Sequence, residues 1–175
     1  QGDPLDPGTV FGPVATVAQF ETVSGYLDSA RREGARIAAG GRSAAPEELG
    51  PGLENGAFIV PTVLADVTED MTVSREEIFG PVITILRYDD SDGRLDDAVR
   101  LANNTEFGLG GIVFGADEDR ALEVARLVDS GSVGINFFGS NHSAPFGGRH
   151  DSGMGVEYGI EGLSAYLSYK SIHRR

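Results

Sequence analysis

Two adjacent carboxylates and an aromatic ring stand directly ahead of the most apolar run in the sequence. Glu76 and Glu77 are followed by Phe79 and by a Gly-Pro turn, after which Val82–Leu86 is expected to form a buried strand. Paired carboxylates can perform general acid–base catalysis, and loops at the end of a sheet often carry functional sites. Adjacent side chains point in different directions, however, so the alternative is that both glutamates are solvated and Phe79 covers the core.

Four phenylalanines fall at the edges of expected strands or in loops, and not at the spacing of a helical core. They are Phe79, Phe137, Phe138 and Phe146. Core packing explains each of them taken singly. Together they predict a pocket with aromatic walls, because ligand sites are concave and are lined mainly by apolar and aromatic side chains.

Several other chemistries are disfavoured. The glycines around Gly108 follow an expected helix and precede an expected strand, which reverses the order of a dinucleotide-binding fingerprint. The histidines, at positions 142, 150 and 173, are not spaced as metal ligands, so no metal site is predicted. No Gly-x-Ser-x-Gly elbow surrounds the neighbouring serines, and a chain without cysteine has no thiolate nucleophile.

The composition limits the class of protein. At 175 residues the chain is long enough for one domain with a sizeable core, and one compact α/β unit is the expectation. Its net charge of -13 repels phosphate backbones and anionic lipids, so neither nucleic acid nor a membrane is expected as a partner. The absence of cysteine excludes a disulfide framework, and no apolar run has spanning length. A cytoplasmic location fits these features.

The first half of the chain is expected to contain a helix and a few short strands. Thr16 and Gln19 have the spacing of a capping box, and apolar residues follow at helical spacing up to Gly34. Short extended pieces are expected at 36–39, 57–60 and 62–64. The stretch 42–55 is polar and rich in Pro, Gly and Glu, which predicts an exposed loop.

The second half alternates between strands and helices. The expected order is a strand at 82–86, a helix at 95–102, a strand at 111–114, a helix that begins at Asp117 and a strand at 132–137. The apolar run at 82–86 is typical of a strand covered on both faces. The alternation predicts right-handed crossovers, and therefore an α/β fold with helices flanking a mainly parallel sheet.

The end of the chain has the pattern of a half-exposed strand. After an expected helical turn at 159–166, Leu167 and Tyr169 fall on one side, and Ser168 and Lys170 fall on the other. A terminal strand that nothing covers has an unpaired edge, which another chain can complete.

Five motifs in order resemble the aldehyde dehydrogenase superfamily. They are Glu-Glu-Ile-Phe-Gly-Pro at 76–81, Gly-Leu at 108–109, Gly-Ile-Asn at 134–136, Ala-Pro-Phe-Gly-Gly at 144–148 and Ser-Gly-Met-Gly at 152–155. The resemblance extends from end to end of the chain. It implies the carboxy-terminal portion of such an enzyme, with residues 1–164 as a catalytic domain incomplete at its N-terminal side. Residues 165–175 would be the strand that joins a neighbouring subunit in a homo-oligomer.

The resemblance implies an enzyme that uses NAD or NADP to oxidise an aldehyde to a carboxylic acid. In this family a cysteine thiolate attacks the aldehyde, hydride passes to the nicotinamide, and a water activated by a glutamate hydrolyses the thioester. The cysteine, this glutamate and an oxyanion asparagine belong to segments ahead of the present chain. No catalytic residue is therefore assigned here, and the chain alone is expected to be inactive.

A few binding residues carry over from the family motifs. The resemblance implies that Glu77 binds the ribose hydroxyls of the nicotinamide half, since a charged acceptor suits two vicinal donors. Phe79 matches the ring that packs beside the nicotinamide. Gln19 matches a helix residue near the same ribose, although its capping position explains it equally well. Phe146 and Phe138 match positions that line the aldehyde pocket.

The chain departs from the family pattern after Pro-Phe-Gly-Gly. Arg149 and His150 stand where an aromatic residue and a lysine are common, and Val156 stands where arginine is usual. These departures concern subunit contacts and substrate preference.

An alternative function is a free-standing, non-catalytic module of the same fold. Such a module would pair through its terminal strand and bind a ligand or a subunit without chemistry. An initiator methionine just before Gln1 would favour the module. Several hundred upstream residues, with a cysteine shortly before Gly2, would favour the enzyme.

Overall fold

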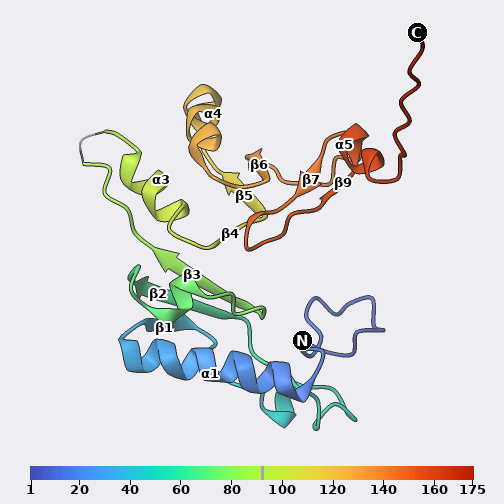
Figure 1. The fold of residues 1–175 in the computed structure, drawn as a ribbon. Helices are drawn as coiled ribbons and strands as arrows, with labels where there is room; N and C mark the ends of the chain where they lie inside the picture. The colour runs from blue at the N-terminus through green and yellow to red at the C-terminus, as the bar shows by residue number, and fades with distance from the viewer. Residues whose placement is uncertain (92) are drawn as a thin grey trace. The chain divides into compact units, whose positions relative to one another are not determined.

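The chain folds as two compact units in a computed structural model that describes residues 1–91 and 93–175. The first unit comprises Gln1–Arg87 and the second Tyr88–Arg175. Helices and short strands occur in both units, which confirms the α/β class (Figure 1). The expectation of one compact unit is therefore wrong, and the division falls directly after the strand at 82–86.

The first unit consists of one long helix packed against a small mixed sheet (Figure 1). Helix α1 (Val17–Glu33) begins after the N-cap Thr16 and ends at Gly34, whose left-handed φ of 97° suits glycine. Both ends lie where the sequence predicted them. The sheet has the order β1-β2-β3, with β1 (Arg36–Ala39), β2 (Thr62–Val67) and β3 (Val82–Leu86). β1 is antiparallel to β2, whereas β2 and β3 are parallel.

Two short helical elements complete the first unit. A 3-10 turn, η1 (Pro46–Glu48), lies in the predicted exposed loop. Helix α2 (Thr72–Arg75) was not expected. Its first residue is held by the end of α1, because the amide and the hydroxyl of Thr72 donate to Glu33 at 2.6 and 2.8 Å. The expected piece at 57–60 forms only an isolated bridge between Ser43 and Ile59.

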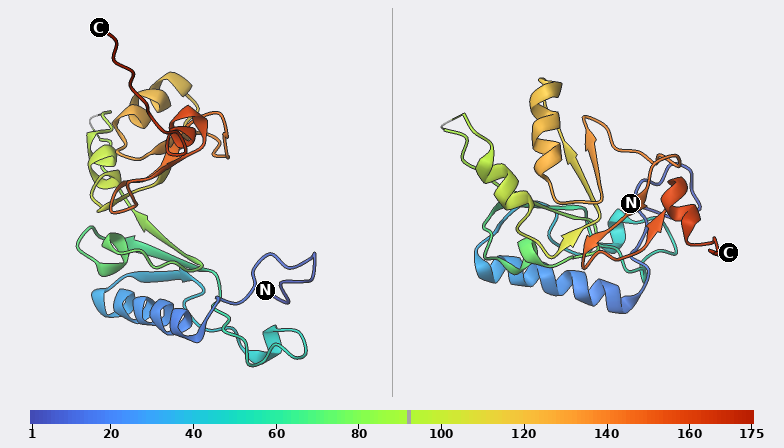
Figure 2. Two further views of the ribbon diagram at one scale, coloured as in Figure 1. Left: turned by 45° about the vertical axis from the view of Figure 1, so that its right-hand side comes forward. Right: turned by 45° about the horizontal axis from the view of Figure 1, so that its top comes forward.

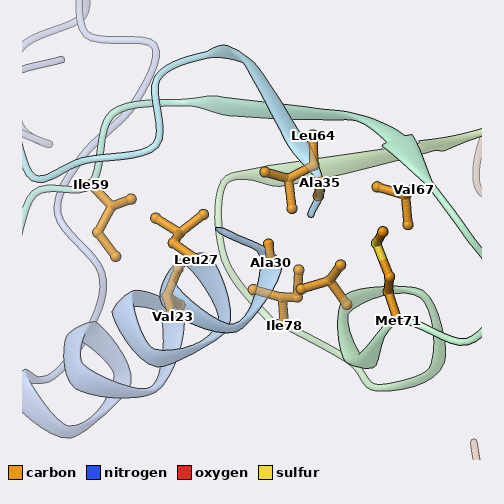
Figure 3. Packing of buried hydrophobic residues seen from close by; sticks show 10 residues of the cluster. Val23, Leu27, Ala30, Ala35, Ile59, Leu64, Val67, Met71 and Ile78 are labelled. Atoms are coloured by element: carbon orange, nitrogen blue, oxygen red, sulfur yellow. The ribbon is translucent and has the colours of Figure 1, made fainter. Parts of the chain in front are cut away.

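The core of the first unit lies between α1 and the sheet (Figure 3). Its buried members are Val23, Leu27, Ala30, Ala35, Ile59, Leu64, Val67, Met71, Val73 and Ile78. Val23, Leu27 and Ala30 follow one another at helical spacing, so a single stripe of α1 supplies the helix side of this core. Burial of each large aliphatic side chain contributes roughly 1.5–3 kcal/mol, which makes this cluster the main source of stability in the unit.

Strand β3 is covered on one face only, so the prediction of a strand buried on both faces is wrong. Val82, Thr84 and Leu86 are half-buried, whereas Ile83 and Ile85 are 64% and 45% exposed. The physical reason is that α1 and its core cover only one side of the three-stranded sheet. The apolar sequence of β3 would allow burial on both faces. It does not indicate which faces other elements cover.

The second unit is built from short two-stranded ladders and three helices in its described residues. The elements are α3 (Asp96–Ala102), β4 (Phe107–Gly108), β5 (Gly110–Val113), α4 (Glu118–Leu127), β6 (Ser132–Ile135), β7 (Phe146–Gly147), β8 (Arg149–His150), β9 (Val156–Glu157) and α5 (Gly159–Ser164). β5 and β6 are parallel and α4 connects them, as the alternating pattern predicted. The ladders β4-β8 and β7-β9 are antiparallel. Because β3 pairs in a different sheet, the strands of the second half do not form the single sheet that was expected.

Burial differs sharply between the two units. Among the described residues of the second unit, Ala121 is the one apolar side chain that is fully buried. The strand residues of β6 are half-buried throughout. This unit is therefore held together more by hydrogen bonds and half-buried contacts than by an enclosed core.

Residues 165–175 form no strand in this structure. Helix α5 ends at Ser164, and the residues after Leu167 continue as an exposed tail (Figure 2). Unpaired backbone groups in an extended segment can be completed by a strand of another chain. The oligomerisation strand and the domain boundary after residue 164 remain predictions. Among the described residues, no helix is both long enough and apolar enough to span a membrane.

Candidate functional site

The two-carboxylate motif forms an exposed turn between α2 and β3, which we call the Glu76–Phe79 segment. Glu76, Glu77 and Phe79 are exposed, whereas Ile78 is buried in the core cluster of the first unit. One buried side chain thus anchors the segment, and the other three are presented to the surface. The alternative in which Phe79 covers the core is wrong, because its side chain is 76% exposed.

Glu77 and Phe79 line the same open surface cavity, of about 250 Å³. The other residues around it are Val73, Glu76, Ile78, Gly80, Val82 and Thr84. A carboxylate and a ring therefore meet at one small depression beside the start of β3. A carboxylate accepts hydrogen bonds from hydroxyl groups, and an exposed ring offers a flat apolar face, so this cavity suits a ligand that combines a polyol with a planar ring.

The backbone of Phe79 adopts a left-handed conformation, with a φ of 50°. Such a conformation is unusual for a bulky residue and costs on the order of 1–3 kcal/mol. Strain of this kind persists only where surrounding contacts hold it, and it is enriched at ligand-binding sites. Because the ring of Phe79 is exposed, packing of that ring does not offset the strain.

Gln19 connects α1 to this segment. Its side-chain nitrogen donates to the carbonyl oxygens of Phe79, at 2.7 Å, and of Ile78, at 3.3 Å. Its backbone amide donates to the hydroxyl of Thr16, so the N-cap half of the expected capping box is present. The other half is not formed, because the Gln19 side chain turns to the Glu76–Phe79 segment. The structure thus places the Gln19 side chain beside the motif. Its amide nitrogen hydrogen-bonds to backbone carbonyls of the Glu76–Phe79 segment.

Tyr26 also contacts the motif, and the sequence did not single it out. Its hydroxyl donates to the Glu76 carboxylate at 2.9 Å. This hydrogen bond, together with slight burial and the nearby negative charge, raises the pKa of Tyr26, so the phenol stays a neutral donor. Tyr26 lies seven residues after Gln19, a spacing that puts both side chains on nearly the same face of a helix. This spacing is the sequence feature that could have indicated Tyr26.

An aromatic pocket of about 620 Å³ lies in the second unit. Phe137, Phe138, Phe146 and Tyr158 supply its rings, and residues 131–134, 139–141 and 144–145 supply the rest of its lining. The structure therefore brings together three of the four phenylalanines from which an aromatic pocket was predicted. The fourth, Phe79, belongs to the first unit.

Tyr158 is the wall residue that sequence reasoning missed. It has a left-handed φ of 60°, and its ring packs against His142 at a centroid distance of 4.6 Å and against Phe146 at 6.0 Å. The amide of Gly159 donates to the His142 carbonyl at 3.2 Å, which ties the start of α5 to the loop that carries this histidine. No motif marks Tyr158, because its role depends on how the preceding loop, which carries His142, packs against its ring.

The glycines of the second unit allow close backbone approaches around this pocket. A Cβ at Gly131 would overlap the carbonyl oxygen of Gly147, and one at Gly134 would overlap that of Phe137. The structure thus supports a packing role for these two glycines, because a side chain at either position would meet backbone atoms of another segment.

Arg149 and His150, which depart from the family pattern, bind one carboxylate. The guanidinium of Arg149 and the imidazole Nε2 of His150 lie 2.6 and 2.7 Å from Asp129. The hydrogen bond from Arg149, and secondly that from His150, lowers the pKa of Asp129. Asn103 also accepts from the amide of Asp129 at 2.8 Å. These residues fasten β8 to the segment after α4.

The described part of the chain contains no group of three or more His, Asp or Glu side chains placed to hold a metal ion. His142 packs against the ring of Tyr158, and His150 contacts the carboxylate of Asp129.

Comparison with known proteins identifies the family. The family model "Aldehyde dehydrogenase family" matches residues 1–172. The chain belongs to the aldehyde dehydrogenase family. Geranial dehydrogenase of Castellaniella defragrans is 42% identical over 172 residues, which cover 98% of this chain and 34% of that protein. A putative aldehyde dehydrogenase of Staphylococcus saprophyticus is 42% identical over 171 residues, with the same coverage of both chains.

Solved aldehyde dehydrogenase structures share the fold. The enzyme from Mycobacterium tuberculosis, complexed with NAD+, has a TM-score of 0.83 at 38% identity, over 92% of this chain and 31% of its own. A mutant of aldehyde dehydrogenase C from Pseudomonas syringae, complexed with NAD+ and octanal, has a TM-score of 0.81 at 41% identity, over 91% of this chain and 31% of its own. The chain therefore spans about a third of the length of the aldehyde dehydrogenases that it matches.

Proposed function

We propose that this chain is part of an NAD(P)-dependent aldehyde dehydrogenase that oxidises an aldehyde to a carboxylic acid. The observation that carries the proposal is the meeting of Glu77 with a strained, exposed Phe79 at one cavity, in a chain that matches the family over residues 1–172. Because the relatives are about three times as long, the activity is assigned to the longer enzyme and not to these 175 residues.

The residues around this cavity fit the nicotinamide half of the cofactor. Glu77 would accept hydrogen bonds from the two vicinal hydroxyls of the ribose, and the exposed ring of Phe79 would pack beside the nicotinamide. Gln19 lies at the base of the same segment, where its amide reaches the Phe79 carbonyl. When bound, NAD supplies the acceptor for the hydride. The complexes of the Mycobacterium tuberculosis and Pseudomonas syringae relatives with NAD+ support this cofactor.

The aromatic pocket of the second unit would bind the aldehyde, with Phe146 and Phe138 in its wall. Its lining carries no charged side chain, which favours an apolar substrate. The name of the geranial dehydrogenase relative and the octanal in the Pseudomonas syringae complex agree with an apolar aldehyde.

The remaining parts of the proposal rest on the sequence. The chain has no cysteine to act as nucleophile, so we expect it to show no aldehyde oxidation by itself. We place it in the carboxy-terminal part of the enzyme because of the order of its motifs. Residues 165–175 would pair with a second subunit. The enzyme would be cytoplasmic, which fits a sequence without cysteine. The mass and sequence of the complete gene product test this placement, which requires a cysteine-containing segment ahead of Gln1.

The cofactor assignment is tested by Glu77→Gln in the complete enzyme. The variant keeps the shape of the side chain but removes the charge, so the KM for NAD should rise roughly tenfold, the cost of one charge-assisted hydrogen bond. The KM for the aldehyde and the thermal midpoint should stay unchanged. Glu47→Gln makes the same chemical change in the exposed η1 turn and serves as control. Equal NAD kinetics in wild type and Glu77→Gln would refute the assignment.

A further inference from the structure

We propose that Tyr26 is a positioning residue for cofactor binding: with Gln19, it holds the Glu76–Phe79 segment against α1 so that Glu77 and Phe79 stand ready for their ligand. This inference rests on the proposed function of Glu77 and Phe79. It adds a residue that would not touch the cofactor and acts through the segment that does.

The segment is attached to α1 at both of its ends. Near the N-terminus of α1, the Gln19 amide donates to the Phe79 carbonyl at 2.7 Å. Two helical turns further along, the Tyr26 hydroxyl donates to the Glu76 carboxylate at 2.9 Å. Seven residues of α-helix rise about 10.5 Å, and they return to nearly the same face of the helix. Both donors can therefore reach one short segment that runs alongside α1.

Between these two hydrogen bonds the segment is packed against α1. Ile78 is buried in the core cluster, to which the fully buried Val23 of α1 also belongs. Gly80 lies so close to α1 that a Cβ at this position would stand 2.7 Å from Cγ2 of Val23. The segment thus has three supports on one helix: a polar contact at each end and an apolar contact in the middle.

Glu77 and Phe79 need this support from outside, because neither side chain is anchored by burial. Both are exposed, and the left-handed backbone of Phe79 is unfavourable for a bulky residue. The hydrogen bond from Gln19 reaches the carbonyl of the strained residue itself, and the one from Tyr26 reaches the residue next to Glu77. A segment held in this way loses less conformational freedom when its ligand binds, which raises affinity.

Tyr26 offers a clean substitution, because its ring and its hydroxyl have separate roles. The half-buried ring packs against the core of the first unit, whereas the hydroxyl reaches the exposed carboxylate of Glu76. Tyr26→Phe keeps the packing and removes only the hydrogen bond. Glu76→Ala removes the same bond from the other side, and Glu76→Gln leaves an amide oxygen that can still accept it.

The test uses the complete enzyme and measures NAD kinetics, aldehyde kinetics and amide hydrogen exchange. For Tyr26→Phe and Glu76→Ala we expect the KM for NAD to rise roughly 3- to 10-fold, the size of one partly exposed hydrogen bond to a charged group. The KM for the aldehyde and the thermal midpoint should not change. Exchange at the amides of residues 76–80 should become faster. The double variant should be no worse than either single variant, and Glu76→Gln should recover most of the affinity.

Two controls separate this inference from the proposed function. Tyr88→Phe removes the same hydroxyl from an exposed tyrosine after β3 and should change nothing. If Glu77→Gln weakens NAD binding but Tyr26→Phe and Glu76→Ala alter neither NAD kinetics nor exchange, the positioning role is wrong and the cofactor site stands. If Glu77→Gln is silent while exchange at 76–80 still responds to Tyr26→Phe, the hydrogen bond holds the segment but the segment does not bind the cofactor, and the positioning role is also refuted.

Discussion

The hydroxyl of Ser152 accepts a hydrogen bond from the amide of Gly108 at 3.0 Å. This contact joins two of the family motifs, which lie 44 residues apart in the sequence. The carbonyl of Gly108 accepts in turn from the amide of Gly131 at 2.9 Å. Both backbone polar groups of a buried glycine are therefore satisfied by other segments, so these motifs hold the second unit together.

Ser152→Ala should destabilise the second unit by about 1–3 kcal/mol, because it leaves the buried amide of Gly108 without its acceptor. Denaturant unfolding of the chain, followed by exchange at the amides of β4 and β8, measures the effect. Ser168→Ala removes a hydroxyl from the exposed tail and should have no effect. Equal stability of the two variants would contradict a structural role for Ser152.

Gly131→Ala should destabilise the same unit by about 1–3 kcal/mol, the usual cost of overpacking, because the added methyl group would overlap the Gly147 carbonyl. Gly155→Ala is the matched control, since nothing lies within 4 Å of the methyl group it adds. The comparison requires only unfolding curves. A stable Gly131→Ala chain would show that β7 can move away at little cost.

The ion pairs of Asp129 predict a loss of stability in acid. Arg149 and His150 hold the folded-state pKa of this carboxyl below its ordinary value of 3.8. The stabilising contribution is therefore complete above the pKa of the unfolded chain and is lost as the pH falls through the lower folded-state value. Unfolding curves at several pH values should show that Asp129→Asn is less stable than wild type near neutrality and that the difference shrinks in acid. Asp90→Asn changes an exposed aspartate in the same way and should give no such trend.

Phe79→Gly should separate stability from binding. Glycine adopts a φ of 50° without the penalty of a side chain, and the exposed ring contributes little burial. We therefore expect a free energy of unfolding that is unchanged or slightly higher. In the complete enzyme the KM for NAD should rise, because the ring that packs beside the nicotinamide is gone. If Phe79→Gly is less stable than wild type and its NAD kinetics are unaltered, both the strain and the cofactor contact of Phe79 are contradicted.

Features that depend on local chemistry were predictable from the sequence. Thr16 and Gly34 mark the ends of α1 because their capping geometry involves only neighbouring residues. Asp117 marks the start of α4 for the same reason, since its carboxylate accepts from the Arg120 amide. Helix α2 was not predictable because its N-cap, Met71, makes no side-chain hydrogen bond. Glu33 of α1 accepts from the amide of Thr72 instead.

Features that depend on distant segments were not predictable. The apolar pattern of β3 could not show that Ile83 and Ile85 lie on an uncovered face. Tyr158 lines the aromatic pocket because the loop that carries His142 packs against its ring. At the candidate site, the motif indicated Glu77 and Phe79, but the contact between Tyr26 and Glu76 exists only once α1 lies beside them.

The seven-residue spacing between Gln19 and Tyr26 makes the length of this part of α1 matter as much as its composition. An insertion of one residue between them would rotate Tyr26 by about 100° around the helix axis, away from Glu76, even if every other side chain were kept. The loop at 42–55 has no such requirement of helical phase. Homologues should therefore vary freely in length at that loop and keep a constant length across the interval from Gln19 to Tyr26.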